Sequence, residues 1–140
     1  MLDSGPLGRL AHANPSRNVE VREWFASLRD ANARFFVPEI ADFEVRRSFL
    51  LENLTGSLAS LNGLVSLATY GPITTEDMRL AAQLWARSRK IGRSVGDPRD
   101  LNADVILAAE AIRLGALIAT DNIGHLAQFT PAQRWAAIHA

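Results

Sequence analysis

The sequence predicts an α/β fold, a three-layer sandwich in which helices flank a short, mostly parallel central sheet. Segments with helical spacing of apolar residues alternate with short apolar runs, which is typical of this class. The run at residues 116–120 passes through Ala, Leu, Ile and Ala, and such a strand is usually covered on both faces, as in a parallel sheet. The length of 140 residues fits a single domain, residues 1–140, with one core.

The predicted helices follow from apolar spacing and from residues that start or stop helices. Asn14 followed by Pro15 marks a helix start, with Asn as the cap and Pro at the first helical position. Gly115 ends the last predicted helix. Helices are predicted at residues 7–13, 15–31, 39–53, 56–67, 74–91 and 101–114.

Two further strands precede the apolar one. Only Leu2 supports a strand before Asp3, so the first strand is very short. The aromatic and β-branched run at residues 34–37 predicts a buried strand. Residues 70–73 are either a strand end or a loop, and residues 92–100 form the longest predicted loop.

The composition excludes several classes of protein. The chain has no cysteine, so it has no disulfide framework, thiol nucleophile or zinc-thiolate site. Its 15 basic and 15 acidic residues give a net charge of zero, which excludes a strongly basic nucleic-acid-binding protein but not a local basic face. No apolar stretch reaches the roughly 18 residues of a membrane span, and no signal peptide is present. We expect a cytoplasmic protein without membrane contact.

Acidic residues stand where an α/β sheet would bring them together. Asp3 and Asp121 follow predicted strands, at the sheet edge where ligands bind, and Glu44 and Asp104 lie in helices. Each has an ordinary alternative role: Asp3 at a frayed terminus, Glu44 as a partner of Arg47, Asp104 as a first-turn acid and Asp121 in a turn. The set as a whole favours a site for Mg²⁺ or Mn²⁺, because clustered carboxylates repel and hard cations prefer oxygen ligands.

Other catalytic chemistry finds no support. His12, His125 and His139 have no paired spacing, and we interpret them as surface or packing residues. The sequence has no nucleophile elbow, phosphate-binding loop or dinucleotide-binding glycine motif. A phosphatase of the haloacid dehalogenase type needs a second acid two residues after the first, and this chain has Gly5 there.

Segments along nearly the whole chain resemble the PIN-domain family, which includes the VapC-type toxin ribonucleases. Residues 2–8 (LDSGPLG) resemble the family's opening strand, in which Ser or Thr follows the first acid. Residues 38–47 (PEIADFEVRR) resemble the segment that carries the second acid, here Glu44. Residues 104–109 (DVILAA) resemble the start of its alanine-rich helix, and residues 117–122 resemble its final strand and turn.

This resemblance implies a PIN-like metal-dependent endoribonuclease that hydrolyses RNA phosphodiester bonds with Mg²⁺ or Mn²⁺. The implied catalytic residues are Asp3, Glu44, Asp104, Asp121 and Asn122, with the four acids as metal ligands. Ser4 and Thr120 would hydrogen-bond a ligand carboxylate. The candidates for RNA backbone contacts are Arg89, Lys90 and Arg93.

Two departures from the family pattern leave alternatives open. The final turn puts Asn122 at the position that is functional in relatives and Asp121 at the variable one. A catalytically impaired PIN-like module that binds RNA or protein is therefore the alternative function. Relatives usually have apolar residues before the first acid, so either the true start lies upstream of Met1 or the strand is short. The implied partners are an RNA substrate, a small antitoxin protein and a second copy in a homodimer.

Overall fold

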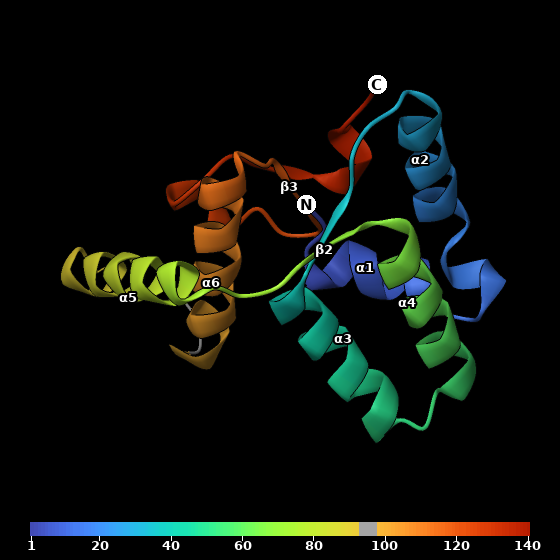
Figure 1. The fold of residues 1–140 in the computed structure, drawn as a ribbon, viewed down its shortest axis with the longest axis horizontal. Helices are drawn as coiled ribbons and strands as arrows, with labels where there is room; N and C mark the ends of the chain where they lie inside the picture. Colours follow the sequence, from blue (N-terminus) through green and yellow to red (C-terminus); the bar gives the residue numbers. More distant parts are fainter. Residues whose placement is uncertain (93–97) are drawn as a thin grey trace.

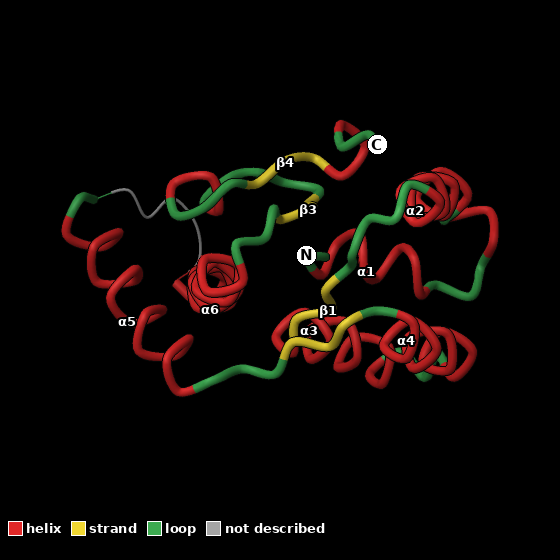
Figure 2. Tube along the Cα trace, turned by 45° about the horizontal axis from the view of Figure 1, so that its top comes forward, coloured by secondary structure: helices red, strands yellow, loops and turns green. Residues whose placement is uncertain are grey.

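Helices make up most of the computed structural model, which describes residues 1–92 and 98–140 (Figures 1 and 2). The α-helices are α1 (Ser4–Ala11), α2 (Val19–Asp30), α3 (Glu39–Leu51), α4 (Thr55–Leu67), α5 (Thr75–Lys90) and α6 (Pro98–Leu114). Short 3-10 helices cover Pro15–Arg17, Leu126–Gln128 and Trp135–Ala137. Of the described residues, no helix is long and apolar enough to cross a membrane.

The strands are short and lie in two separate parallel sheets. β1 (Phe36–Pro38) pairs with β2 (Thr69–Gly71), and β3 (Ile118–Thr120) pairs with β4 (Ala132–Arg134). The predicted three-layer sandwich around one central sheet is therefore wrong. Each strand has only three residues, which is too little surface to form a layer that helices could cover on both faces.

The first three residues connect the two sheets. The Leu2 N–H donates to the Phe36 carbonyl oxygen at 3.0 Å, on the side of β1. The Asp3 N–H donates to the Ala119 carbonyl oxygen at 3.0 Å, and Leu2 forms an isolated parallel bridge with Ala119 of β3. The strand predicted at Leu2 is reduced to this bridge. Asp3 is thereby held beside the end of β3.

Most predicted helices are confirmed to within a few residues. The exception is the helix predicted at residues 15–31, which is divided into a 3-10 turn and α2. The break falls at Asn18, whose φ of −136° is not helical. The loop predicted at residues 92–100 falls mostly outside the described residues, and α6 begins at Pro98.

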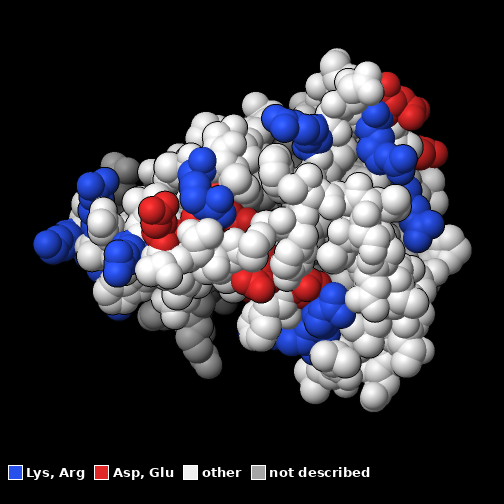
Figure 3. Space-filling view, viewed as in Figure 1, with Lys and Arg blue, Asp and Glu red and all other residues white. Residues whose placement is uncertain are grey.

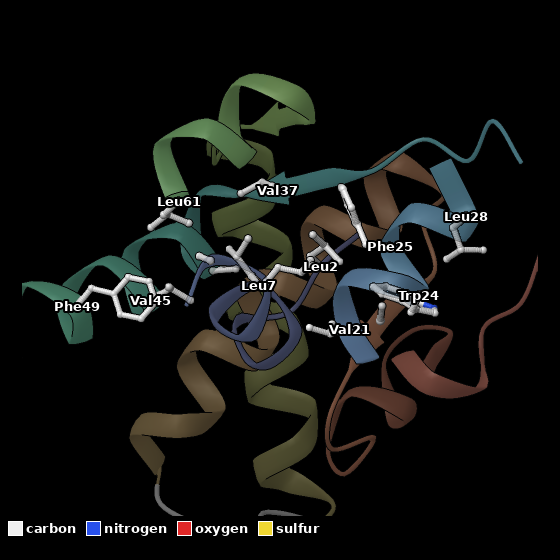
Figure 4. Packing of buried hydrophobic residues seen from close by; sticks show 14 residues of the cluster. Leu2, Leu7, Val21, Trp24, Phe25, Leu28, Val37, Val45, Phe49 and Leu61 are labelled. Atoms are coloured by element: carbon white, nitrogen blue, oxygen red, sulfur yellow. The ribbon is translucent and has the colours of Figure 1, made fainter. Parts of the chain in front are cut away.

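The main hydrophobic core lies among α1, α2, α3 and α4 (Figure 4). Leu7 of α1 and Leu61 of α4 are completely buried in it, and so is Val37 of β1. A second cluster holds α5 against α6, with Leu84 and Val105 among its buried members. α6 thus packs between α5 and the rest of the molecule (Figure 1).

Candidate functional site

Asp3 lies at the start of α1 and is held by hydrogen bonds from two directions. Its Oδ1 accepts from the backbone N–H of Ser4, the first residue of the helix that Asp3 caps, at 2.7 Å. Its Oδ2 accepts from the Thr120 hydroxyl at 2.6 Å. Ser4 and Thr120, which the resemblance implies as partners of a ligand carboxylate, therefore both contact Asp3. The carboxylate is fixed between α1 and the end of β3.

Asp104 on α6 lies close to two other acids. Burial raises its pKa to about 6, and the negative charges of Asp3 and Glu44 add to this increase. His125 opposes the increase through its hydrogen bond and its charge. Asp3 at the chain start and Glu44 on α3 are therefore near enough to Asp104 on α6 for their charges to raise its pKa. We call Asp3, Glu44 and Asp104 the acidic cluster.

Glu44 also has the ordinary partner that its spacing allows. The Arg47 Nη2 lies 3.8 Å from the Glu44 Oε1, at the i,i+3 spacing of α3. The Arg47 side chain is 61% exposed, so this ion pair is screened by water and is worth little.

The structure gives Asp121 a different set of contacts. Its Oδ2 accepts from the Arg9 Nε at 3.1 Å, and its Oδ1 accepts from the Trp135 Nε1 at 2.8 Å. A side chain at Gly5 would overlap this carboxylate, so α1 runs directly against it. Asp121, directly after β3, thus forms hydrogen bonds with α1 and with the last 3-10 helix. Asn122 donates its backbone N–H to the Thr120 hydroxyl at 3.0 Å, within the same turn.

His125 is a site residue that the sequence did not reveal. Its Nδ1 lies 3.3 Å from the Asp104 Oδ2, although its position in the sequence predicts only a surface or packing residue. Both side chains are partly exposed, at 26% for His125 and 29% for Asp104. No spacing signal could identify this contact, because the two residues belong to different elements. Their proximity depends on how the turn after β3 packs against α6.

The side chains of the acidic cluster are of the type that binds a hard divalent cation, but they are not arranged closely enough to bind one. Its partly exposed carboxylates repel one another, and Mg²⁺ or Mn²⁺ would neutralise them with oxygen ligands. In residues 1–92 and 98–140, however, no three or more His, Asp or Glu side chains are placed closely enough to hold a metal ion. A cation at this site would have to draw the carboxylates together.

The predicted RNA-contacting residues lie elsewhere. Arg89 stacks on Trp85, with its guanidinium carbon 5.3 Å from the ring centroid, in the last turns of α5 beside Lys90. This end of α5 is at the edge of the molecule, away from the chain start (Figures 1 and 2). Arg93 lies outside the described residues. Figure 3 shows other basic side chains next to acidic ones near the start of α3.

The fold is similar to that of two solved structures. It matches a chain of FitAcB from Neisseria gonorrhoeae with a TM-score of 0.72 and 20% identity, over 98% of each chain. It matches a chain of VapBC2 from Rickettsia felis, bound to a DNA fragment from their promoter, with a TM-score of 0.68 and 18% identity. That match covers 96% of this chain and 97% of the other. No family model and no curated protein matches the chain. At these identities the similarity concerns the fold alone.

Proposed function

We propose that the protein is a metal-dependent endoribonuclease in which the acidic cluster holds Mg²⁺ or Mn²⁺. The observation that carries this proposal is that burial raises the pKa of Asp104 to about 6 and that the negative charges of Asp3 and Glu44 add to this increase. The resemblance to PIN-domain ribonucleases supports it, because the same three residues occupy that family's acidic positions.

In this proposal the metal and the residues around it have distinct roles. The metal would supply a water of lowered pKa and would neutralise charge on the phosphate as its bond breaks. Asp3 provides a ligand whose direction is set by Ser4 and Thr120. His125 contacts Asp104 and favours its ionised form. Below about pH 6 Asp104 binds a proton, so metal binding should weaken there.

We further propose that the chain is the toxin of a toxin-antitoxin pair, with a small antitoxin protein as its partner. The fold similarity to a VapBC2 chain and the sequence resemblance to VapC-type toxins both support this role. Leu50, Leu51 and Leu67 are exposed at 58%, 83% and 69% on α3 and α4, where an antitoxin could bury them. The homodimer implied by the family remains a prediction.

A second candidate function is a binding module with an impaired metal site. It is supported by the contacts of Asp121, because this fourth acid already has the positively charged Arg9 as an ion-pair partner and also accepts from Trp135. A titration with Mn²⁺, followed by thermal unfolding, separates the two functions. The nuclease should gain stability at millimolar Mn²⁺, whereas the impaired module should not respond.

The test of the nuclease is Mn²⁺-dependent RNA cleavage by the wild type and by Asp3→Asn. Asparagine is as good a helix cap as aspartate, so this variant should keep α1 while it loses a metal ligand. Cleavage should disappear and the thermal unfolding temperature without metal should stay the same. Asp30→Asn, at the exposed end of α2, is the matched control and should remain active. Full activity of Asp3→Asn would refute the proposal.

A further inference from the structure

An exposed aromatic ring lies next to the acidic cluster. Phe43 precedes Glu44 in α3 and is 55% exposed, although phenylalanine is usually buried. The guanidinium carbon of Arg47 lies 5.3 Å from the Phe43 ring centroid. The same guanidinium is 3.8 Å from the Glu44 carboxylate. One arginine therefore contacts both the exposed ring and a residue of the acidic cluster.

The helical spacing of α3 explains this arrangement. Arg47 follows Phe43 by four residues and Glu44 by three, so all three side chains meet on one side of the helix. The opposite side carries Val45 and Phe49, which are buried in the main core. Phe43 is thus held at the surface by the packing of its own helix.

We propose that Phe43 and Arg47 form a platform for one nucleotide of single-stranded RNA beside the acidic cluster. This inference rests on the proposed nuclease function and adds two residues that would position its substrate. The exposed ring would stack on a base, and Arg47 would contact the adjoining phosphate. Bases in a duplex are already stacked on one another, so the platform would bind single strands in preference to duplexes.

The charge on Arg47 favours a nucleic acid over a protein at this surface. An apolar protein interface on Phe43 would remove water from a guanidinium that is 61% exposed and whose ion pair with Glu44 is long, at 3.8 Å, which is unfavourable. A phosphate would give Arg47 a second negatively charged partner. The pair of Phe25 and Arg29 has the same spacing, with the guanidinium carbon 5.9 Å from the ring. Phe25 is only 8% exposed, so that pair serves the core.

The test is the affinity of the protein for a short fluorescein-labelled single-stranded RNA and for the same RNA in a duplex, measured by fluorescence anisotropy in EDTA. Phe43→Ala should weaken single-strand binding roughly tenfold, as expected when one base loses an aromatic partner. Phe43→Trp should restore the affinity. Leu51→Ala removes another exposed apolar side chain of α3 and should bind like the wild type. Duplex affinity should be the same for all four proteins.

Cleavage kinetics with Mn²⁺ provide the second readout. Phe43→Ala should raise KM for single-stranded RNA roughly tenfold and leave kcat nearly unchanged, because the platform binds substrate without touching the reacting atoms. Unchanged thermal unfolding would show that the variant is folded.

The results distinguish failure of the platform from failure of the nuclease. If the wild type cleaves RNA but Phe43→Ala binds single strands equally well, the platform is refuted and the nuclease is not. A conversion from dimer to monomer in Phe43→Ala, with RNA affinity unchanged, would refute it in favour of an interface between copies. If the wild type neither binds nor cleaves RNA, both proposals fail.

Discussion

Helix α6 carries two carboxyl groups whose pKa values are raised, in contrasting surroundings. Asp104 is 29% exposed and faces two acids and a histidine, and burial is the largest cause that raises its pKa to about 6. Glu110 is completely buried, and neither of its oxygens has a hydrogen-bond partner among the described residues. Burial, followed by the charge of Asp77, raises the pKa of Glu110 to about 7.

The backbone of β2 packs closely against Glu110. A side chain at Gly71 would overlap a carboxylate oxygen of Glu110, so β2 runs directly against it. Asp77 beside it is 1% exposed and is bound by the Arg113 Nε at 2.7 Å and Nη2 at 2.9 Å. A raised pKa alone therefore does not identify a metal-binding carboxylate. An acid that solvent can reach can exchange its proton for a cation, whereas an enclosed acid keeps its proton.

The sharpest test of this contrast replaces each acid with its amide. Asp104→Asn should reduce Mn²⁺-dependent RNA cleavage by at least about a thousandfold, because a metal ligand is lost. Glu110→Gln should cleave at the wild-type rate, because glutamine has nearly the shape of a protonated glutamate. Steady-state cleavage rates of the two variants provide the measurement. Equal loss of activity in both would show that the difference between the two acids is irrelevant to function.

The next effect concerns the ion pair beside Glu110. Burial by itself would raise the pKa of Asp77, but hydrogen bonds from Arg113 and Thr74 lower it, so Asp77 is an ionised acid in the interior. Arg113→Ala would leave that charge without its partner and should reduce the free energy of unfolding by about 3 kcal/mol. Urea denaturation provides the measurement, with the exposed Arg22→Ala of α2 as control. A loss similar to that of the control would mean that Arg113 is not needed to hold Asp77.

Glu110 should also make stability depend on pH. Its pKa is raised from 4.5 to about 7 in the folded protein, so the folded state holds the proton longer than the unfolded state does. This contribution is complete below pH 4.5 and is lost as pH rises towards 7, at about 1.4 kcal/mol for each pH unit.

Glu110→Gln lacks this titration. Its free energy of unfolding should therefore increase relative to the wild type between pH 4.5 and 7, and the difference should stay constant at higher pH. Urea denaturation at several pH values, with the exposed Glu23→Gln as control for the loss of one charge, measures the difference. A constant difference across this window would show that Glu110 is ionised in the folded protein.

The smallest predicted effect concerns His125. Its contact with Asp104 lowers the pKa of that carboxyl, so His125→Ala should raise it further. The pH at which Mn²⁺ gives half of its maximal thermal stabilisation should move upward by a fraction of a unit. His139→Ala, at the exposed end of the chain, is the control. If this pH midpoint stayed the same in both variants, His125 would have no influence on the pKa of Asp104.

The sequence anticipated elements whose signals are local. The helices from residue 39 onward were predicted to within a few residues because apolar spacing, capping residues and Gly115 act over one or two turns. The prediction of one central sheet was wrong, because strand pairing joins residues that lie far apart in the sequence, as Phe36 of β1 and Thr69 of β2 do. Short apolar runs do not reveal how long a ladder they will form.

For the candidate site, too, the sequence indicated residue types, whereas only the structure gave their contacts. The sequence alone offered Asp3, Glu44 and Asp104 as candidates, because each stands at a strand end or on a helix in a recognisable order, and their role as metal ligands stays a prediction. Only the tertiary structure turned Asp121 towards Arg9 and Trp135, and only it brought His125 to Asp104. The physical reason is that a side chain's type is fixed by the chain, whereas its partners depend on how distant elements pack. For the turn after β3, that packing is set by α1, α6 and the last 3-10 helix together.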